Sequence, residues 1–123
     1  MERVTFFFDT YAFYGLIVGN KNYLPYKNCK IITTRLNLME LHYSLLKKYN
    51  LNTANKYFEK LSKFSIKIPN EIIKKANQFK CDHKKQKLSY VDRIGYLLAK
   101  LHDVKFLTGD KEFENFENTE FVK

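Results

Sequence analysis

In VTFFFDTYAFY, residues 4–14, a run of apolar and β-branched residues stops abruptly at Asp9. A short apolar run of this kind predicts a strand that is buried on both faces, as in a parallel sheet. Asp9 would then lie where the chain leaves the core. A carboxylate in that position either caps the following helix or belongs to a site at the end of the sheet.

Strand-like runs alternate with helical patterns along the rest of the chain. Further strands are predicted at residues 30–33, 65–68, 104–107 and 119–122. Apolar residues recur at helical spacing over residues 34–50, 52–64, 70–79 and 90–102. Because alternating strands and helices form parallel sheets with helices on both faces, the sequence predicts a three-layer α/β/α fold, in one domain that spans residues 1–123.

The composition indicates an intracellular protein with a polyanionic partner. The 123 residues include 22 Lys and Arg against 13 Asp and Glu, and the formal net charge of +9 favours a partner such as nucleic acid. Cys29 and Cys81 lack the spacing of a metal site or a disulfide framework, and no apolar run reaches the ~18 residues of a membrane span. We therefore expect a cytoplasmic protein without a membrane partner.

A dense basic run, KCDHKKQK at residues 80–87, leads into the segment that holds Asp92. Because the run lacks an apolar period, it predicts an exposed loop. Lys84, Lys85 and Lys87 in this run are candidate contacts to an RNA backbone. Many other lysines fall at helical positions, where a solvated helix face is the simpler interpretation.

Four acidic residues fall where the predicted fold would gather side chains. Asp9 and Asp110 each follow a strand, and parallel sheets bind ligands at the carboxyl ends of their strands. Asp92 lies in the first turn of the last predicted helix. Glu40 lies in the first predicted helix, at the edge of its polar face. The apolar stripe predicted for that helix consists of Leu36, Met39, Tyr43 and Leu46.

Each of these acids also has a purely structural interpretation. Asp9 and Asp110 are suited to cap the helices that follow them, and Ser89 and Asp92 have the spacing of a capping box. Glu40 alone is typical of a solvated helix position. Together, however, the four carboxylates form the oxygen ligand set that Mg²⁺ and Mn²⁺ prefer, and such ions promote phosphodiester cleavage.

The segments FFFDTY, LNLMEL, LSYVDRIGYLLAKLHDVKFLTGDKEF and TEFV give the chain a resemblance to PIN domains, in the branch that includes VapC-like toxin ribonucleases. The resemblance spans essentially the whole chain and implies a parallel sheet in strand order 3-2-1-4-5. It also implies a hydroxyl of Thr108 placed to hydrogen bond in the site. The catalytic and metal-binding acids that it implies are Asp9, Glu40, Asp92 and Asp110.

By this resemblance the protein is a Mg²⁺- or Mn²⁺-dependent endoribonuclease that cleaves single-stranded or loop RNA. The implied biological role is the toxin of a toxin–antitoxin pair, with a cognate antitoxin and a second copy of the chain as partners. Tyr11 stands where many members carry a small polar residue, so it narrows the site or stacks on a base, and Lys111 is a candidate phosphate contact. The alternative function is a non-catalytic RNA-binding or protein-interaction module on the same fold.

Overall fold

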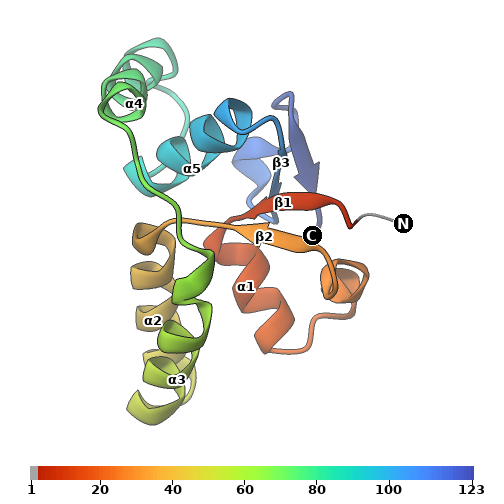
Figure 1. The fold of residues 1–123 in the computed structure, drawn as a ribbon. Coiled ribbons are helices and arrows are strands. Elements are labelled where there is room, and N and C mark those ends of the chain that lie inside the picture. The colour runs from red at the N-terminus through yellow and green to blue at the C-terminus, as the bar shows by residue number, and fades with distance from the viewer. Residues whose placement is uncertain (1–2) are drawn as a thin grey trace.

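The computed structural model describes residues 3–123, in which a parallel sheet is covered by helices on both faces (Figure 1). The sheet consists of β1 (Thr5–Phe8), β2 (Lys30–Ile32), β3 (Lys105–Thr108) and β4 (Thr119–Phe121), in the order β2-β1-β3-β4. All the pairings are parallel, and Phe7 of β1 lies opposite Ile32 of β2 and Phe106 of β3. Segments near the start and the end of the sequence therefore pair at the centre of the sheet.

The helices of the described residues are α1 (Thr10–Ile17), α2 (Arg35–Lys48), α3 (Leu51–Leu61), α4 (Asn70–Asp82) and α5 (Tyr90–Leu101). Short 3-10 helices occupy Lys21–Tyr26, Ser62–Phe64 and Lys111–Phe113. Helices α1, α2 and α3 lie on one face of the sheet, and α4 and α5 lie on the other (Figure 1). Over residues 3–123, no helix has the length and apolar character that a membrane crossing requires.

Two hydrophobic cores form because neighbouring residues of a strand point to opposite faces of the sheet. Phe7 and Phe106 pack on the side of α4 and α5, whereas Phe8 and Leu107 pack on the side of α1 and α2, and all four are fully buried. Helix α5 approaches the sheet closely at Gly95, where a Cβ would lie 2.8 Å from the ring of Phe7. The predicted three-layer α/β/α fold is confirmed.

The predicted outer strand at residues 65–68 is reduced to a single parallel bridge between Ser65 and Thr33. The amide of Ile66 donates to the carbonyl of Thr33 at 2.9 Å, and the pairing then stops. Three residues later the chain reaches Pro69, which lacks an N–H and leads into α4, so little length is left for a strand. The four observed strands correspond to positions 2-1-4-5 of the expected order, so the difference is confined to this edge.

Helix α1 was not predicted by the sequence pattern. Its residues, TYAFYGLI, are apolar on nearly all sides and rich in aromatic residues that favour strands, so no helical period stands out. The segment is helical because it is enclosed by the fold, with Ala12, Phe13 and Gly15 buried. Gly15 allows the close packing, since a Cβ there would lie 2.5 Å from the ring of Tyr23.

The buried face of α2 differs from the predicted apolar stripe. Leu38, Leu41 and Leu45 are the buried leucines, and they pack with residues of α1 and α3. Three residues of the predicted stripe are instead exposed: Met39, Tyr43 and Leu46. Helix α2 carries apolar residues on two faces, and its neighbours α1 and α3 cover only the leucine face. The predicted stripe was therefore wrong, and the face that bears Glu40 and Tyr43 is open.

The basic run at residues 80–87 is a loop only in its second part, because α4 continues to Asp82. Arg93 of α5 holds the loop from inside and is only 3% exposed. Its guanidinium donates to the carbonyl of Leu88 and, at 3.3 Å, to the carbonyl of Gln86. Among the described residues Arg93 has no acidic partner within ion-pair distance. Backbone carbonyls therefore stabilise this buried charge.

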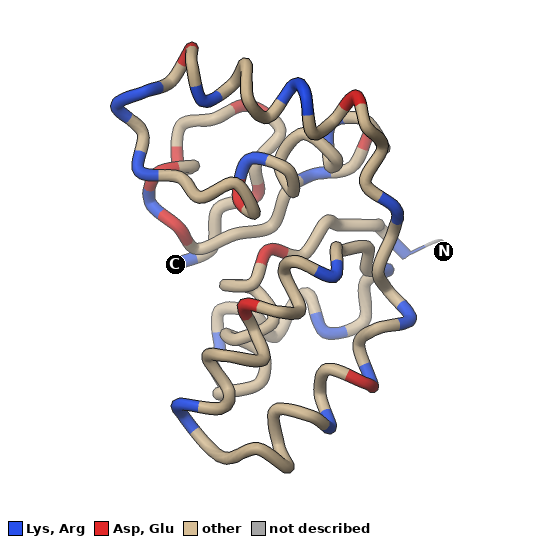
Figure 2. The backbone as a smooth tube through the Cα atoms, turned by 90° about the vertical axis from the view of Figure 1, so that its left-hand side faces the viewer, with Lys and Arg blue, Asp and Glu red and all other residues tan. Residues whose placement is uncertain are grey.

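The positive charge of the protein is not confined to this loop. Lys and Arg occur along helices of both outer layers of the fold, as Figure 2 shows. Much of the net charge of +9 therefore belongs to helix surfaces, as the simpler interpretation of the sequence holds. A nucleic-acid site has to be located from its lining residues and not from charge alone.

Candidate active site

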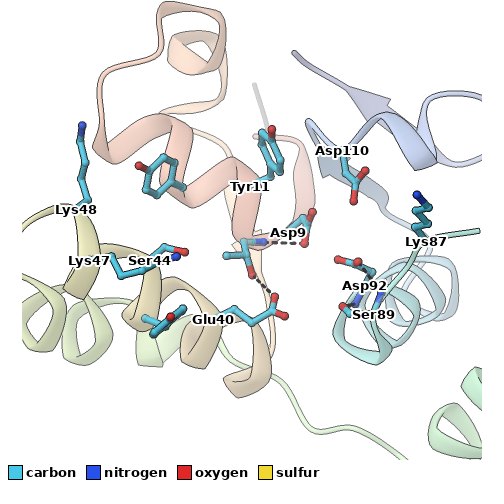
Figure 3. Close-up of a pocket in the computed structure, with 13 residues that line it drawn as sticks. Asp9, Tyr11, Glu40, Ser44, Lys47, Lys48, Lys87, Ser89, Asp92 and Asp110 are labelled. Carbon is cyan, nitrogen blue, oxygen red and sulfur yellow. Dashed lines mark hydrogen bonds between the residues drawn. The ribbon is translucent and has the colours of Figure 1, made fainter.

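The four predicted acids line one cavity of about 870 Å³ at the carboxyl ends of β1 and β3 (Figure 3). Asp9 follows β1 and Asp110 follows β3, whereas Glu40 projects from α2 and Asp92 from the first turn of α5. The volume is typical of ligand-binding cavities, which commonly measure about 300–1,000 Å³. The fold thus brings together four side chains that are far apart in the sequence.

Three donors fix the carboxylate of Asp9, which is only 3% exposed. Its Oδ1 accepts from the amide of Thr10 at 2.8 Å and from Nδ2 of Asn37 at 3.4 Å. Its Oδ2 accepts from the hydroxyl of Thr108 at 2.7 Å. Asp9 is therefore the N-cap of α1, as the structural interpretation predicted, and it also lines the cavity. The two interpretations of this residue are compatible.

Burial makes three acids of the cavity, Asp9, Glu40 and Asp92, harder to ionise. Burial, followed by the negative charge of Asp92, raises the pKa of Asp9 from its ordinary 3.8 to about 7, although the bonds from Thr108 and Thr10 oppose this shift. Burial also raises the pKa values of Glu40 and Asp92. Over residues 3–123, none of the four acids forms an ion pair with Lys or Arg.

Thr10 and Asn37 support the acids through a polar network that the sequence analysis missed. The hydroxyl of Thr10 donates to Oε1 of Glu40 at 3.1 Å, so Thr10 contacts two of the acids. Asn37 is fully buried, and its Oδ1 accepts from the hydroxyl of Thr34 at 2.6 Å, which leaves Nδ2 to donate to Asp9. The available signal was an asparagine within an apolar helix, three residues before Glu40.

The capping box predicted for Ser89 and Asp92 is present at the start of α5. The amide of Asp92 donates to Oγ of Ser89 at 3.1 Å, and the amide of Ser89 donates to Oδ2 of Asp92 at 3.0 Å. These bonds use only one oxygen of the Asp92 carboxylate. Asp92 can therefore cap the helix and still offer Oδ1 to the cavity that it lines.

Two substitutions separate these roles. Ser89→Ala should lower the free energy of unfolding by about 1 kcal/mol and leave the response to metal unchanged, because it removes only a helix cap. Asp92→Asn should lower the free energy of unfolding by less, because the amide oxygen of asparagine can still accept from the amide of Ser89. The substitution also removes a negative charge that the other acids repel. The stabilisation of this variant by added Mg²⁺ or Mn²⁺ should shrink sharply. Thermal melting of both variants with and without metal measures this, and equal losses with an unchanged metal response would leave Asp92 only a cap.

Asp110 caps the short 3-10 helix Lys111–Phe113 while its side chain lines the cavity. Its Oδ1 accepts from the amide of Glu112 at 3.0 Å, and its own amide donates to the hydroxyl of Thr108 at 3.1 Å. The preceding residue must be glycine, because a Cβ on Gly109 would lie 2.7 Å from the ring of Tyr11. Tyr11 is 53% exposed and covers this strand end at the rim of the cavity.

The predicted basic contacts are only partly at the site. Lys87 lines the cavity beside Asp92 and Asp110 (Figure 3). The other three predicted lysines are exposed and are not among the lining residues: Lys84, Lys85 and Lys111. The loop thus contributes one cation to the edge of the acidic group.

The chemistry of the cavity suits a cation more than any other ligand of the acids. In the described part of the chain, no three Asp, Glu, His or Cys side chains lie close enough together to form a metal centre. The four carboxylates nevertheless line one cavity, and they are the side chains that could hold a cation there. Their oxygen atoms are the ligands that hard divalent cations prefer.

The family model of the PIN domain matches residues 6–118. The chain therefore belongs to the PIN domain family, as the sequence motifs indicated. A search of curated proteins gives no match.

Several solved structures have the same fold. VapC20 from Mycobacterium tuberculosis, described as a sarcin–ricin loop cleaving toxin, is 16% identical, with a TM-score of 0.79 and coverage of 96% of this chain and 99% of that one. A toxin–antitoxin complex from Klebsiella pneumoniae is 21% identical, with a TM-score of 0.70 and coverage of 93% and 94%. VapBC2 from Rickettsia felis, bound to a promoter DNA fragment, is 14% identical, with a TM-score of 0.71 and coverage of 98% and 100%. At these identities the likeness establishes the fold.

Proposed function

We propose that the chain is a metal-dependent endoribonuclease that cleaves single-stranded or loop RNA. The observation that carries this proposal is the convergence of four carboxylates, from four different elements, on one cavity. Within residues 3–123 no Lys or Arg lies within ion-pair distance of them, so their mutual repulsion is only partly relieved. A positively charged ligand explains such a group better than a structural role does. Membership of the PIN family supports a nuclease.

Mg²⁺ or Mn²⁺ fits this group, because both ions prefer oxygen ligands and leave positions for water and for a phosphate group. The proposed ligands are Asp9, Glu40, Asp92 and Asp110. When bound, such a cation supplies positive charge that favours ionisation of an attacking water molecule and neutralises the phosphate.

The remaining residues of the site position these ligands and the substrate. Thr108 and Asn37 orient Asp9, and Thr10 orients Glu40, so two acids keep fixed directions even when the cavity is open to water. This support resembles the hydrogen bonds that hold metal ligands in proteins generally. The proposed RNA contacts are Tyr11 and Lys87 at the cavity and, further along the backbone, Lys84, Lys85 and Lys111.

The similar structures support a role in a toxin–antitoxin pair. One is a toxin–antitoxin complex, another is a VapBC complex and the third is described as a sarcin–ricin loop cleaving toxin. We therefore include a cognate antitoxin among the proposed partners. A second copy of this chain and a cytoplasmic location are proposals from the sequence alone.

RNA cleavage by the purified protein tests this function. We expect a labelled single-stranded RNA to be cut in Mg²⁺ or Mn²⁺ and to remain intact in EDTA. Glu40→Gln should remove most of the cleavage, whereas Glu59→Gln, the same change on the exposed face of α3, should not. If the wild-type protein binds RNA but never cuts it with any divalent cation, the chain is a binding module. Cleavage that persists in EDTA would also contradict the proposal.

A further inference from the structure

The cavity extends well beyond the acids. One part holds Asp92, Asp110 and Lys87, and on the other side of Asp9 and Glu40 it continues along α1 and α2 (Figure 3). The side chains that line this second part, here called the tyrosine–lysine arm, are Tyr14, Tyr43, Ser44, Lys47 and Lys48. The arm contains no carboxylate, so its chemistry differs from that of the acidic part.

Helix α2 builds most of the arm from one of its faces. Tyr43 and Ser44 lie three and four residues after Glu40, and Lys47 lies four and three residues after them, which places all four on one face of the helix. With a rise of about 1.5 Å per residue, Lys47 lies about 10 Å along the helix from Glu40. The neighbouring nucleotides of a strand whose phosphate meets the acids can span that distance.

The arm offers flat apolar rings and positive charges in the same place. Tyr43 is 62% exposed, although a ring of this size is usually well buried. The Nζ of Lys47 lies 4.5 Å from the centroid of the Tyr43 ring, so a cation and an aromatic surface are held together. Single-stranded nucleic acids are bound by this combination, in which bases stack on aromatic rings and lysines contact the backbone.

We propose that the tyrosine–lysine arm is a binding subsite for the nucleotides on one side of the cleaved bond in a single-stranded RNA. Tyr43 and Tyr14 stack on unpaired bases, and Lys47 and Lys48 contact the phosphates between them. This inference rests on the proposed nuclease function, because the acids define which phosphate is cleaved. The inference specifies that the RNA strand runs from the acids along α2. A duplex cannot bind to the arm in this way, because its paired bases are not free to stack on the tyrosines.

The test measures binding separately from cleavage. All variants carry Asp110→Asn so that the RNA stays intact, and affinity for a short fluorescein-labelled RNA in Mg²⁺ is followed by fluorescence anisotropy. Tyr43→Ala should weaken binding of the single strand about 10-fold, because stacking on an aromatic ring contributes on that scale for each base. The affinity for the same RNA annealed to its complement should not change. Tyr43 is exposed, so this variant should fold normally.

The lysines are tested by salt dependence with a matched control. Lys47→Gln combined with Lys48→Gln should lower the slope of log affinity against log salt by about 1.4, since each lost phosphate contact on a single strand accounts for about 0.7. Lys56→Gln combined with Lys60→Gln, an equal charge change on exposed residues of α3, should keep the parent slope.

The outcomes separate this inference from the nuclease function. If the Asp110-intact protein cuts RNA but the arm variants bind like the parent, the subsite is wrong and the function stands. If it cuts no RNA but Tyr43→Ala still loses affinity for single strands, the nuclease function fails and the arm is a binding surface for single strands without cleavage. If Tyr43→Ala loses the same affinity for single-stranded and double-stranded RNA, the proposed stacking of bases on Tyr43 is wrong. Unchanged RNA binding with altered self-association would make the arm a protein contact and also overturn the subsite.

Discussion

Replacing Asp9 by asparagine is expected to abolish metal-dependent cleavage and, at the same time, to stabilise the metal-free protein above pH 7. Cleavage should fall by more than about 100-fold, because even residues that only support a metal ligand contribute about 10–100-fold. The helix cap should survive, since asparagine is as good an N-cap as aspartate. The amide also removes the charge that burial makes costly at this position.

The pH dependence follows from the raised pKa of Asp9. Between its ordinary pKa of 3.8 and its folded pKa of about 7, the folded protein holds a proton that the unfolded chain releases. The free energy of unfolding therefore falls as the pH rises through this range, and above pH 7 the full cost is present. The pKa difference corresponds to about 4 kcal/mol, and about half should appear as a gain in Asp9→Asn, because neutral hydrogen bonds replace stronger charged ones.

Urea unfolding in EDTA at pH 5 and pH 8 measures this effect. The gain of Asp9→Asn over the wild type should be larger at pH 8 than at pH 5, and added Mg²⁺ should reverse the order by stabilising only the wild type. Asp82→Asn, an exposed aspartate at the end of α4, is the matched control and should show neither change. If Asp9→Asn and the wild type are equally stable at both pH values, with and without Mg²⁺, Asp9 acts only as a cap.

Replacing Arg93 by alanine is expected to have the largest effect on stability outside the two cores, a loss of about 2–4 kcal/mol. The substitution leaves the carbonyls of Leu88 and Gln86 without their donor and removes a buried side chain that lies over the ring of Phe79 at 6.0 Å. Arg93→Lys keeps the charge, but a single ammonium group cannot donate to the two carbonyls as the guanidinium does. The stability of this variant should therefore lie between those of the wild type and Arg93→Ala.

Two measurements distinguish loss of the loop from loss of the fold. Urea unfolding gives the global stability, and limited trypsin digestion reports on the loop, because trypsin can cut after Lys84, Lys85 and Lys87. In Arg93→Lys the loop should be cut faster than in the wild type while the protein remains folded. Lys100→Ala, which removes an exposed ion pair with Glu117, should change stability by less than about 1 kcal/mol. An Arg93→Lys variant with wild-type digestion would show that the guanidinium does not hold the loop.

Much of the fold was predictable because its strongest signals are local. The apolar runs that became β1 and β3 are buried on both faces, so their composition alone marks them. The prediction of an outer strand at residues 65–68 was wrong, because its hydrogen bonds depend on the edge of β2 and its length is limited by Pro69. Helix α1 was missed because a helix that the fold surrounds has apolar residues on most sides, so its sequence lacks the periodic pattern of apolar and polar residues that identifies a helix.

The candidate site was predictable to the extent that strand ends locate side chains. Asp9 and Asp110 follow buried strands, and that position alone marked them as candidates. Glu40 follows no strand, and it was marked by its position at the edge of the polar face of a predicted helix and by the resemblance to the PIN family. Asn37 and the tyrosine–lysine arm could not be predicted, because α2 has two apolar faces and only packing against α1 and α3 decides which one is open. The predicted buried stripe of α2 included Tyr43, so the sequence analysis did not identify Tyr43 as an exposed residue.

The pairing of β1 with β3 also has a consequence for the order of events while the protein is being made. Asp9 and Thr108 are hydrogen bonded although they lie 99 positions apart in the chain. During synthesis β1 is translated well before β3, the strand that completes its pairing. Contacts of such large separation form late in folding. A chain translated only as far as α5 therefore has three of the acids, Asp9, Glu40 and Asp92, and the cavity can assemble only after β3 and Asp110 have been translated.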